Sequence, residues 1–198
     1  MKALRSASAG IGPLLQRDYW AVIKNSRLKP SEIMELVCQR FPEFAPSELT
    51  VFTKVADERP AEDSPECPLE LNDVLDIQIP MAGQCAVRVL DRRPTSLTLG
   101  TLEGHPECGK ITFGSYRNPR GEVIFHIRSR ARSSSRKHYL GFLTIGEPMQ
   151  TNTWTEFVNR VALSVGEGVV SGIHSETSEV HDGTPEMDEG PTFLVQAD

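Results

Sequence analysis

Three side chains in this sequence could transfer a proton near neutral pH: His105, Glu107 and His126. His105 and Glu107 are separated only by Pro106, so they could form a polar pair at the mouth of a binding site. An imidazole titrates near neutral pH and can act as a general acid or base. The segment also has a conformational interpretation, because Gly104 and Pro106 turn the chain and His105 can support that turn. The sequence leaves both interpretations open.

Other catalytic motifs are missing from the sequence. His138 could join His105 and His126 around a metal ion, but no two histidines have H-x-H or H-x-x-x-H spacing. There is no nucleophile elbow, phosphate-binding glycine loop or H-E-x-x-H motif. The cysteines contain no C-x-x-C pair; they are Cys38, Cys67, Cys85 and Cys108. We therefore expect neither a metal ion nor a cofactor.

Cationic side chains alternate along residues 122–132. Arg128, Arg130 and Arg132 share one face of the expected strand, and Arg136 and Lys137 follow it. The pattern fits a solvated edge strand protected from aggregation. It also fits an anion-binding site formed by Arg128, Arg130, Arg132 and Arg136, or a surface for a protein, nucleic acid or anionic membrane. Nucleic acid is disfavoured, because no aromatic residues alternate with the arginines.

The opposite face of the same strand is apolar at its start and small at its end. Small inward residues leave room for a ligand or for a closely packed helix. The expected ligand-binding residues come from this face and from the apolar face of the closing helix; they are Phe125, Ile127, Ser129, Trp154, Phe157 and Val161.

The elements that must position these residues follow from the hydrophobic patterns. Residues 19–23 form a short aromatic and β-branched strand, and Pro30 begins an amphipathic helix. Six alternating runs separated by short turns then predict antiparallel strands: 49–55, 74–79, 85–90, 97–102, 111–116 and 122–132. Thr153 and Glu156 form a capping box before a closing helix that ends at Gly166.

We therefore predict an α+β fold in which a curved antiparallel sheet of about six to seven strands packs against an N-terminal and a C-terminal helix. This order of elements resembles the helix-grip fold of the START and polyketide-cyclase superfamily. That resemblance implies a cavity between the sheet and the closing helix.

A second resemblance depends on residues 100–109, Gly-Thr-Leu-Glu-Gly-His-Pro-Glu-Cys-Gly. They resemble the Gly-Thr-Leu-x-Gly-His-Pro-Glu-x-Gly signature of an uncharacterised family with a domain of unknown function. The family's later motifs correspond here to residues 121–123, residues 129–131 and Gln150. Lys110 and Ile111 replace the two acids usual in the family, and Ala131 replaces a proline. The resemblance implies a shared structure but supplies no mechanism.

Length and charge predict the domain organisation. A chain of 198 residues suits one well-buried core. Seven of the 27 acidic residues lie from Ser171 onward, where there is no Lys or Arg. The rest of the chain contains 20 acidic and 21 basic residues, so its charges nearly balance. We expect an N-terminal extension (1–13), a single domain (14–168) and a disordered acidic tail (169–198). No signal peptide or membrane-spanning run is apparent, so we expect a cytoplasmic protein.

The sequence favours binding of a small hydrophobic or amphipathic molecule between the sheet and the closing helix. Two alternatives remain: an enzyme of cyclase or hydrolase type that uses the same cavity, and an anion- or protein-binding module that uses residues 128–138. The identity of the ligand and the oligomeric state do not follow from the sequence.

Overall fold

The computed structural model describes residues 2–48, 50–55, 68–79, 83–135, 147–181 and 183. Its strands are β1 (Ile11–Ile23), β2 (Val51–Lys54), β3 (Val74–Ile79), β4 (Gly83–Arg93), β5 (Ser96–Thr101), β6 (Glu107–Arg117), β7 (Val123–Ser133) and β8 (Val169–Val180). Its helices are α1 (Pro30–Gln39), α2 (Phe41–Phe44) and α4 (Glu147–Val165), and a 3-10 turn, η1 (Ala7–Ala9), precedes β1.

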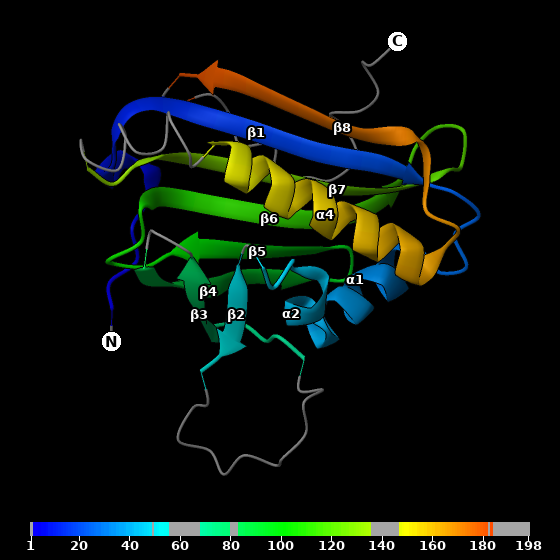
Figure 1. Cartoon of the computed structure of the whole chain (residues 1–198), viewed down its shortest axis with the longest axis horizontal. Coiled ribbons are helices and arrows are strands. Elements are labelled where there is room, and N and C mark those ends of the chain that lie inside the picture. The colour runs from blue at the N-terminus through cyan, green and yellow to red at the C-terminus, as the bar shows by residue number, and fades with distance from the viewer. Residues whose placement is uncertain are drawn as a thin grey trace.

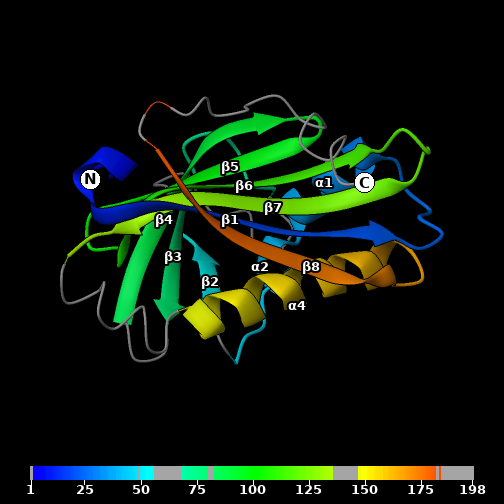
Figure 2. The same cartoon turned by 90° about the horizontal axis from the view of Figure 1, so that it is seen from above.

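The strands form one antiparallel sheet in the order β2-β3-β4-β5-β6-β7-β1-β8 (Figure 1). The sheet is curved, and α4 crosses the same face of β7, β1 and β8 (Figures 1 and 2). The predicted α+β class and helix-grip arrangement are confirmed. In the described residues the sheet has eight strands rather than about six to seven, because Val169–Val180 add β8 at its edge.

The first helix begins as its sequence predicts. Pro30 occupies the first turn, and the Glu32 carboxylate accepts a hydrogen bond from the Lys29 backbone N–H at 2.7 Å. This bond satisfies one of the N–H groups that a helix start leaves unpaired. The buried face of α1 consists of Ile33, Met34, Val37 and Cys38.

The closing helix begins earlier than predicted. It begins at Glu147 rather than at Thr153, so Thr153 is not a cap. Instead, its hydroxyl donates to the Met149 carbonyl one turn earlier, at 2.9 Å. The predicted apolar face is buried against the sheet; its fully buried members are Phe157, Val158, Val161, Ala162 and Val165.

Aromatic side chains form the centre of the core. The Phe157 ring lies 5.2 Å from both Phe41 and Phe113, measured between ring centroids. These three rings come from α4, from α2 and from β6, respectively. The three rings therefore pack α2 and α4 against the middle of the sheet. This packing fixes the position of α4 along the sheet.

The tail differs from the expected disordered segment. Residues Val169–Val180 form β8, which pairs with β1 over most of its length. Val169, Val170 and Ile173 supply the apolar and β-branched side chains that favour a strand, whereas Glu176 and Glu179 remain exposed. The segment is acidic in composition, but these apolar side chains suit a strand and it pairs with β1. Of the rest of the tail, residues 182 and 184–198 lie outside the described residues.

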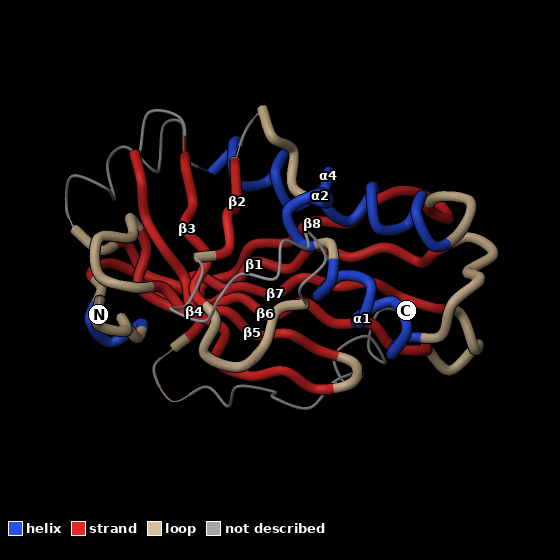
Figure 3. The backbone as a smooth tube through the Cα atoms, turned by 90° about the horizontal axis from the view of Figure 1, so that it is seen from below, coloured by secondary structure: helices blue, strands red, loops and turns tan. Residues whose placement is uncertain are grey.

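The arginine-bearing strand is not at an edge. β7 lies between β6 and β1, so the edge-strand interpretation of its arginines is wrong (Figure 3). The first strand also begins earlier than expected, at Ile11, within the segment expected to be an extension. Residues 136–146, including Arg136, Lys137 and His138, lie outside the described residues.

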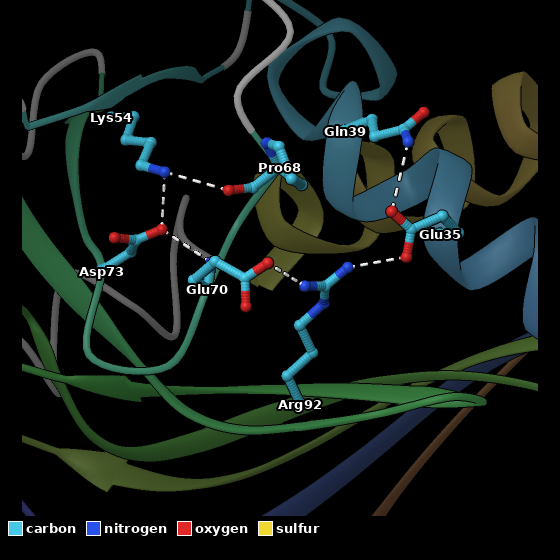
Figure 4. Close-up of polar contacts among 7 residues, drawn as sticks. All are labelled: Glu35, Gln39, Lys54, Pro68, Glu70, Asp73 and Arg92. Atoms are coloured by element: carbon cyan, nitrogen blue, oxygen red, sulfur yellow. Dashed lines mark hydrogen bonds and ion pairs between the residues drawn. The ribbon is translucent and has the colours of Figure 1, made fainter. Parts of the chain in front are cut away.

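A polar network fastens α1 to the sheet (Figure 4). Arg92, near the end of β4, contacts Glu35 of α1 at 2.7 Å and also pairs with Glu70. Nearby, the Lys54 ammonium lies 2.6 Å from the Asp73 carboxylate, and that carboxylate accepts from the Glu70 backbone N–H. We assign these contacts a structural role, because they link α1, β2, β4 and the segment that precedes β3.

No described helix has the length and apolar character to cross a membrane.

Candidate functional site

A buried ion pair lies where α4 begins to cross the sheet. The Arg17 guanidinium of β1 contacts the Glu107 carboxylate of β6 at 3.1 Å, and their side chains are only 2% and 13% exposed. The Gln150 amide N–H of α4 donates to the second Glu107 oxygen at 3.0 Å. Glu107 therefore connects the sheet to the helix through two partners.

Among the residues that the structure describes, three neutral polar atoms at this interface are buried without a hydrogen-bond partner. They are the Ser129 hydroxyl oxygen, the Gln150 side-chain carbonyl oxygen and the Trp154 indole nitrogen. Buried polar groups are nearly always hydrogen-bonded, so each exception needs an explanation. We call Arg17, Glu107, Ser129, Gln150 and Trp154 the inner-face cluster.

Strand register places this cluster together. Arg17 pairs directly with Ser129 across β1 and β7, so both side chains lie on the same face of the sheet. On α4, Gln150 and Trp154 are one helical turn apart and share a face. The Trp154 ring lies 5.5 Å from Phe113, which pairs with Ile127, two residues from Ser129. The polar end of the interface therefore adjoins the aromatic core.

The segment 100–109 forms the turn that brings Glu107 to this place. The Thr101 hydroxyl accepts a hydrogen bond from the Gly109 N–H at 3.0 Å. A Cβ atom at Gly109 would lie 2.1 Å from the Arg130 carbonyl oxygen, so only glycine fits against β7 there. Gly104 has a φ of +93°, a conformation that glycine adopts easily.

His105 supports this turn through the backbone. Its Nδ1 lies 3.0 Å from both the backbone nitrogen and the carbonyl oxygen of Glu107, so the ring meets main-chain atoms of the turn in either tautomer. The Glu107 carboxylate is directed instead to Arg17 and Gln150. The observed contact joins the His105 ring to the main chain of Glu107.

The third candidate for proton transfer, His126, lies on the opposite face of the sheet. Its Nε2 contacts the Asp18 carboxylate at 2.7 Å, and the Tyr116 hydroxyl lies 3.3 Å from its Nδ1. Burial lowers the pKa of His126 below its ordinary value. Burial opposes ionisation of Asp18, but hydrogen bonds from His126 and Arg128 outweigh it and lower the pKa of Asp18. The structure therefore does not bring His126 together with Glu107.

The arginines expected to bind anions also lie on that outer face. Arg128 Nε donates to Asp18 at 2.6 Å, Arg130 Nε to Gln16 at 2.7 Å, and Arg132 Nε to the Gly12 carbonyl at 3.0 Å. All three acceptors belong to β1, so each arginine connects β7 to its neighbouring strand. Arg136, the fourth predicted member, lies outside the described residues.

The predicted ligand-binding residues all face α4 or belong to it, and all are buried: Phe125, Ile127, Ser129, Trp154, Phe157 and Val161. Only Ser129 and Trp154 belong to the inner-face cluster. Arg17 and Gln150 belong to the inner-face cluster but were not among the predicted site residues. The sequence did contain a signal for Arg17. It lies an even number of positions from Tyr19, Ala21 and Ile23, so it shares their inward face of β1.

The described residues contain no group of three or more His, Cys, Asp or Glu side chains that could hold a metal ion. Burial raises the pKa of the Cys38 and Cys85 thiols, to about 12 for Cys85. Thiols held in the neutral form are poor nucleophiles and poor metal ligands. Among the described residues, the inner-face cluster holds one buried ion pair and several hydrogen-bonding groups.

Several solved structures share this fold at low sequence identity. The KanY protein is 10% identical, with a TM-score of 0.54, and the similarity covers 80% of this chain and 100% of that one. Truncated norcoclaurine synthase from Thalictrum flavum is 9% identical, with a TM-score of 0.51, covering 78% and 96%. The di-domain ARO/CYC protein StfQ of the steffimycin biosynthetic pathway is 11% identical, with a TM-score of 0.50, covering 78% and 51%. These similarities establish the fold alone.

Sequence comparison places the chain in a family. A search of the curated proteins finds no match. The family model described as Domain of unknown function (DUF1990) matches residues 29–163. The match extends from the residue before α1 to near the end of α4 and includes Glu107, Ser129, Gln150 and Trp154. With most of its length covered, this chain belongs to the DUF1990 family.

Proposed function

We propose that this protein binds a small hydrophobic or amphipathic molecule between the sheet and α4, at the inner-face cluster. One observation chiefly supports the proposal: Ser129, Gln150 and Trp154 each bury a polar atom that has no partner within the described part of the chain. A buried polar group without a hydrogen bond costs about 1–3 kcal/mol. A bound molecule that supplied the partners would remove part of that cost.

Entry of the molecule requires movement, because the three atoms are already screened from solvent. Farther along α4, Phe157, Val158 and Val161 are fully buried against the core. We therefore place the binding site at the N-terminal turns of the helix, where the polar atoms lie. Binding that requires a conformational change is slower than diffusion allows, so we expect slow association.

Binding is favoured over catalysis because the groups that could transfer protons are dispersed. Glu107 lies in the cluster, the His105 ring contacts the main chain of its turn, and His126 lies on the other face of the sheet. General acid–base catalysis needs such groups within hydrogen-bond reach of one substrate.

Native mass spectrometry of freshly purified protein tests the proposal. We expect the intact chain to carry an additional small-molecule mass that organic solvent extracts. A Ser129→Leu variant should lose this mass, because it replaces the hydroxyl with a larger apolar side chain directly beside Arg17. A Thr112→Leu variant is the matched control, because its added volume lies on the outer face, opposite Arg128. The proposal fails if purified protein is free of bound molecules and takes up no apolar probe.

A further inference from the structure

We propose that the molecule bound at the inner-face cluster is electrically neutral and carries a hydroxyl group on a mostly apolar body. This inference rests on the proposed function, because it specifies the chemistry of the molecule bound at that site. It follows from the charges of the cluster and from its unsatisfied polar atoms.

The charges of the cluster are already matched. Arg17 and Glu107 carry opposite charges and contact each other at 3.1 Å. An anionic ligand would add a negative charge next to the Glu107 carboxylate, and a cationic one would compete with Arg17 for it. Transfer of an unmatched charge into a water-poor site is strongly unfavourable. The site therefore favours a neutral head group.

The unsatisfied atoms specify what that head group must offer. The Trp154 indole nitrogen can only donate, whereas the Gln150 carbonyl oxygen can only accept. The orientation of the Gln150 amide is fixed, because its nitrogen must be the atom that donates to Glu107. The Ser129 hydroxyl can do either. A ligand hydroxyl has one donor and two acceptor sites, so it complements this set, whereas an ether or a hydrocarbon does not.

The surroundings of the cluster specify an apolar body. The Trp154 ring contacts Phe113, Phe52 and Phe157, with ring centroids 5.5, 6.3 and 6.1 Å away. Ile127 is buried on the facing strand. A planar or aliphatic body would pack among these side chains and transfer its apolar surface from water.

Three probes that share the naphthalene ring system separate the contributions of a hydroxyl group, of a negative charge and of the apolar body to binding. 2-Naphthol carries a neutral hydroxyl at pH 7.4, 2-naphthoate carries a negative charge, and 2-methylnaphthalene has no polar group. Equilibrium dialysis against the full chain gives the Kd of each. We expect 2-naphthol to bind about tenfold more tightly than 2-methylnaphthalene, which corresponds to about one recovered hydrogen bond. 2-Naphthoate should bind more weakly than both.

Two conservative variants test which atoms give the preference. Ser129→Ala removes the hydroxyl, and Trp154→Phe removes the indole N–H while keeping an aromatic ring. Each should lower the preference for 2-naphthol over 2-methylnaphthalene, taken as the ratio of their Kd values, about fivefold. Ser115→Ala is the control, because the buried Ser115 hydroxyl already donates to the Ile124 carbonyl at 2.9 Å. Circular dichroism verifies the fold of each variant, and Ser129→Ala alone decides the test if Trp154→Phe unfolds.

The outcomes separate the two proposals. Equal binding of all three probes, tightest binding of 2-naphthoate, or an unchanged preference in Ser129→Ala overturns the hydroxyl inference while leaving ligand binding intact. If no probe binds the full chain and no molecule copurifies with it, the proposed function itself fails.

Discussion

The buried pair between Arg17 and Glu107 gives the most direct test of the site's construction. Glu107→Gln keeps the size of the side chain and one oxygen, but it removes the negative charge 3.1 Å from the guanidinium. At an effective dielectric constant of about 20, two unit charges at that distance attract by about 5 kcal/mol. Breaking a buried pair by removing one partner typically costs about 3–5 kcal/mol. We expect the free energy of unfolding to fall by that amount.

Urea unfolding followed by far-UV circular dichroism measures this change. The matched control is Glu103→Gln in the same turn. The Glu103 carboxylate pairs with Arg5 at 3.4 Å, but the two side chains are 59% and 42% exposed. Exposed pairs contribute about 0–1 kcal/mol, so this variant should be nearly as stable as the parent. A similar loss in both variants would contradict a special role for burial.

A double variant isolates the charge from the shape. Arg17→Met combined with Glu107→Gln removes both charges and keeps an apolar chain of similar length. We expect it to be more stable than Glu107→Gln alone, because no buried cation is left without this carboxylate. The reasoning is refuted if Glu107→Gln costs less than about 1 kcal/mol, or if the double variant loses the sum of both single losses.

Two further perturbations have defined outcomes. Gly109→Ala should lower the free energy of unfolding by about 3 kcal/mol, because its Cβ would overlap the Arg130 carbonyl. Gly104→Ala, with open space around it, should lower the same free energy by only about 1 kcal/mol. Equal losses in urea unfolding would contradict the close approach of Gly109 to β7. Because burial lowers the pKa of His126 in the folded chain, the unfolded chain binds an additional proton below about pH 6.5. Stability should therefore fall with decreasing pH in that range, by up to about 1.4 kcal/mol per pH unit. His126→Gln should remove this contribution, and an unchanged pH profile would show that His126 is not held neutral.

The sequence was sufficient for the elements with a clear hydrophobic period. The apolar face from Trp154 to Val165 predicted the closing helix, and its contact with the sheet followed. Its beginning did not follow, because Thr153 and Glu156 have the pattern of a capping box and nevertheless lie within the helix. Local patterns cannot reveal that tertiary packing extends a helix past a good capping sequence.

The site was harder to predict because it depends on strand register. Arg17 and Glu107 are 90 positions apart, and only the register of β1, β7 and β6 puts them on one face. Small residues such as Ser129 suggested room for a ligand, yet Arg17 lies directly beside Ser129. A charged side chain in an aromatic strand looks exposed in the sequence. Here Arg17 is buried because its partner, Glu107, belongs to another strand, β6.

The alternation of β7 separates two kinds of polar side chain. On the outer face, Arg128, Arg130 and Arg132 each donate to β1, so their charges hold two strands together. On the inner face, Ser129 presents a neutral hydroxyl for which the described residues provide no partner. If these arginines bound an anionic ligand, the anion would have to compete with acceptors already held in the sheet. A neutral ligand at Ser129 displaces no such bond, and for this reason the inner face is the better candidate for recognition.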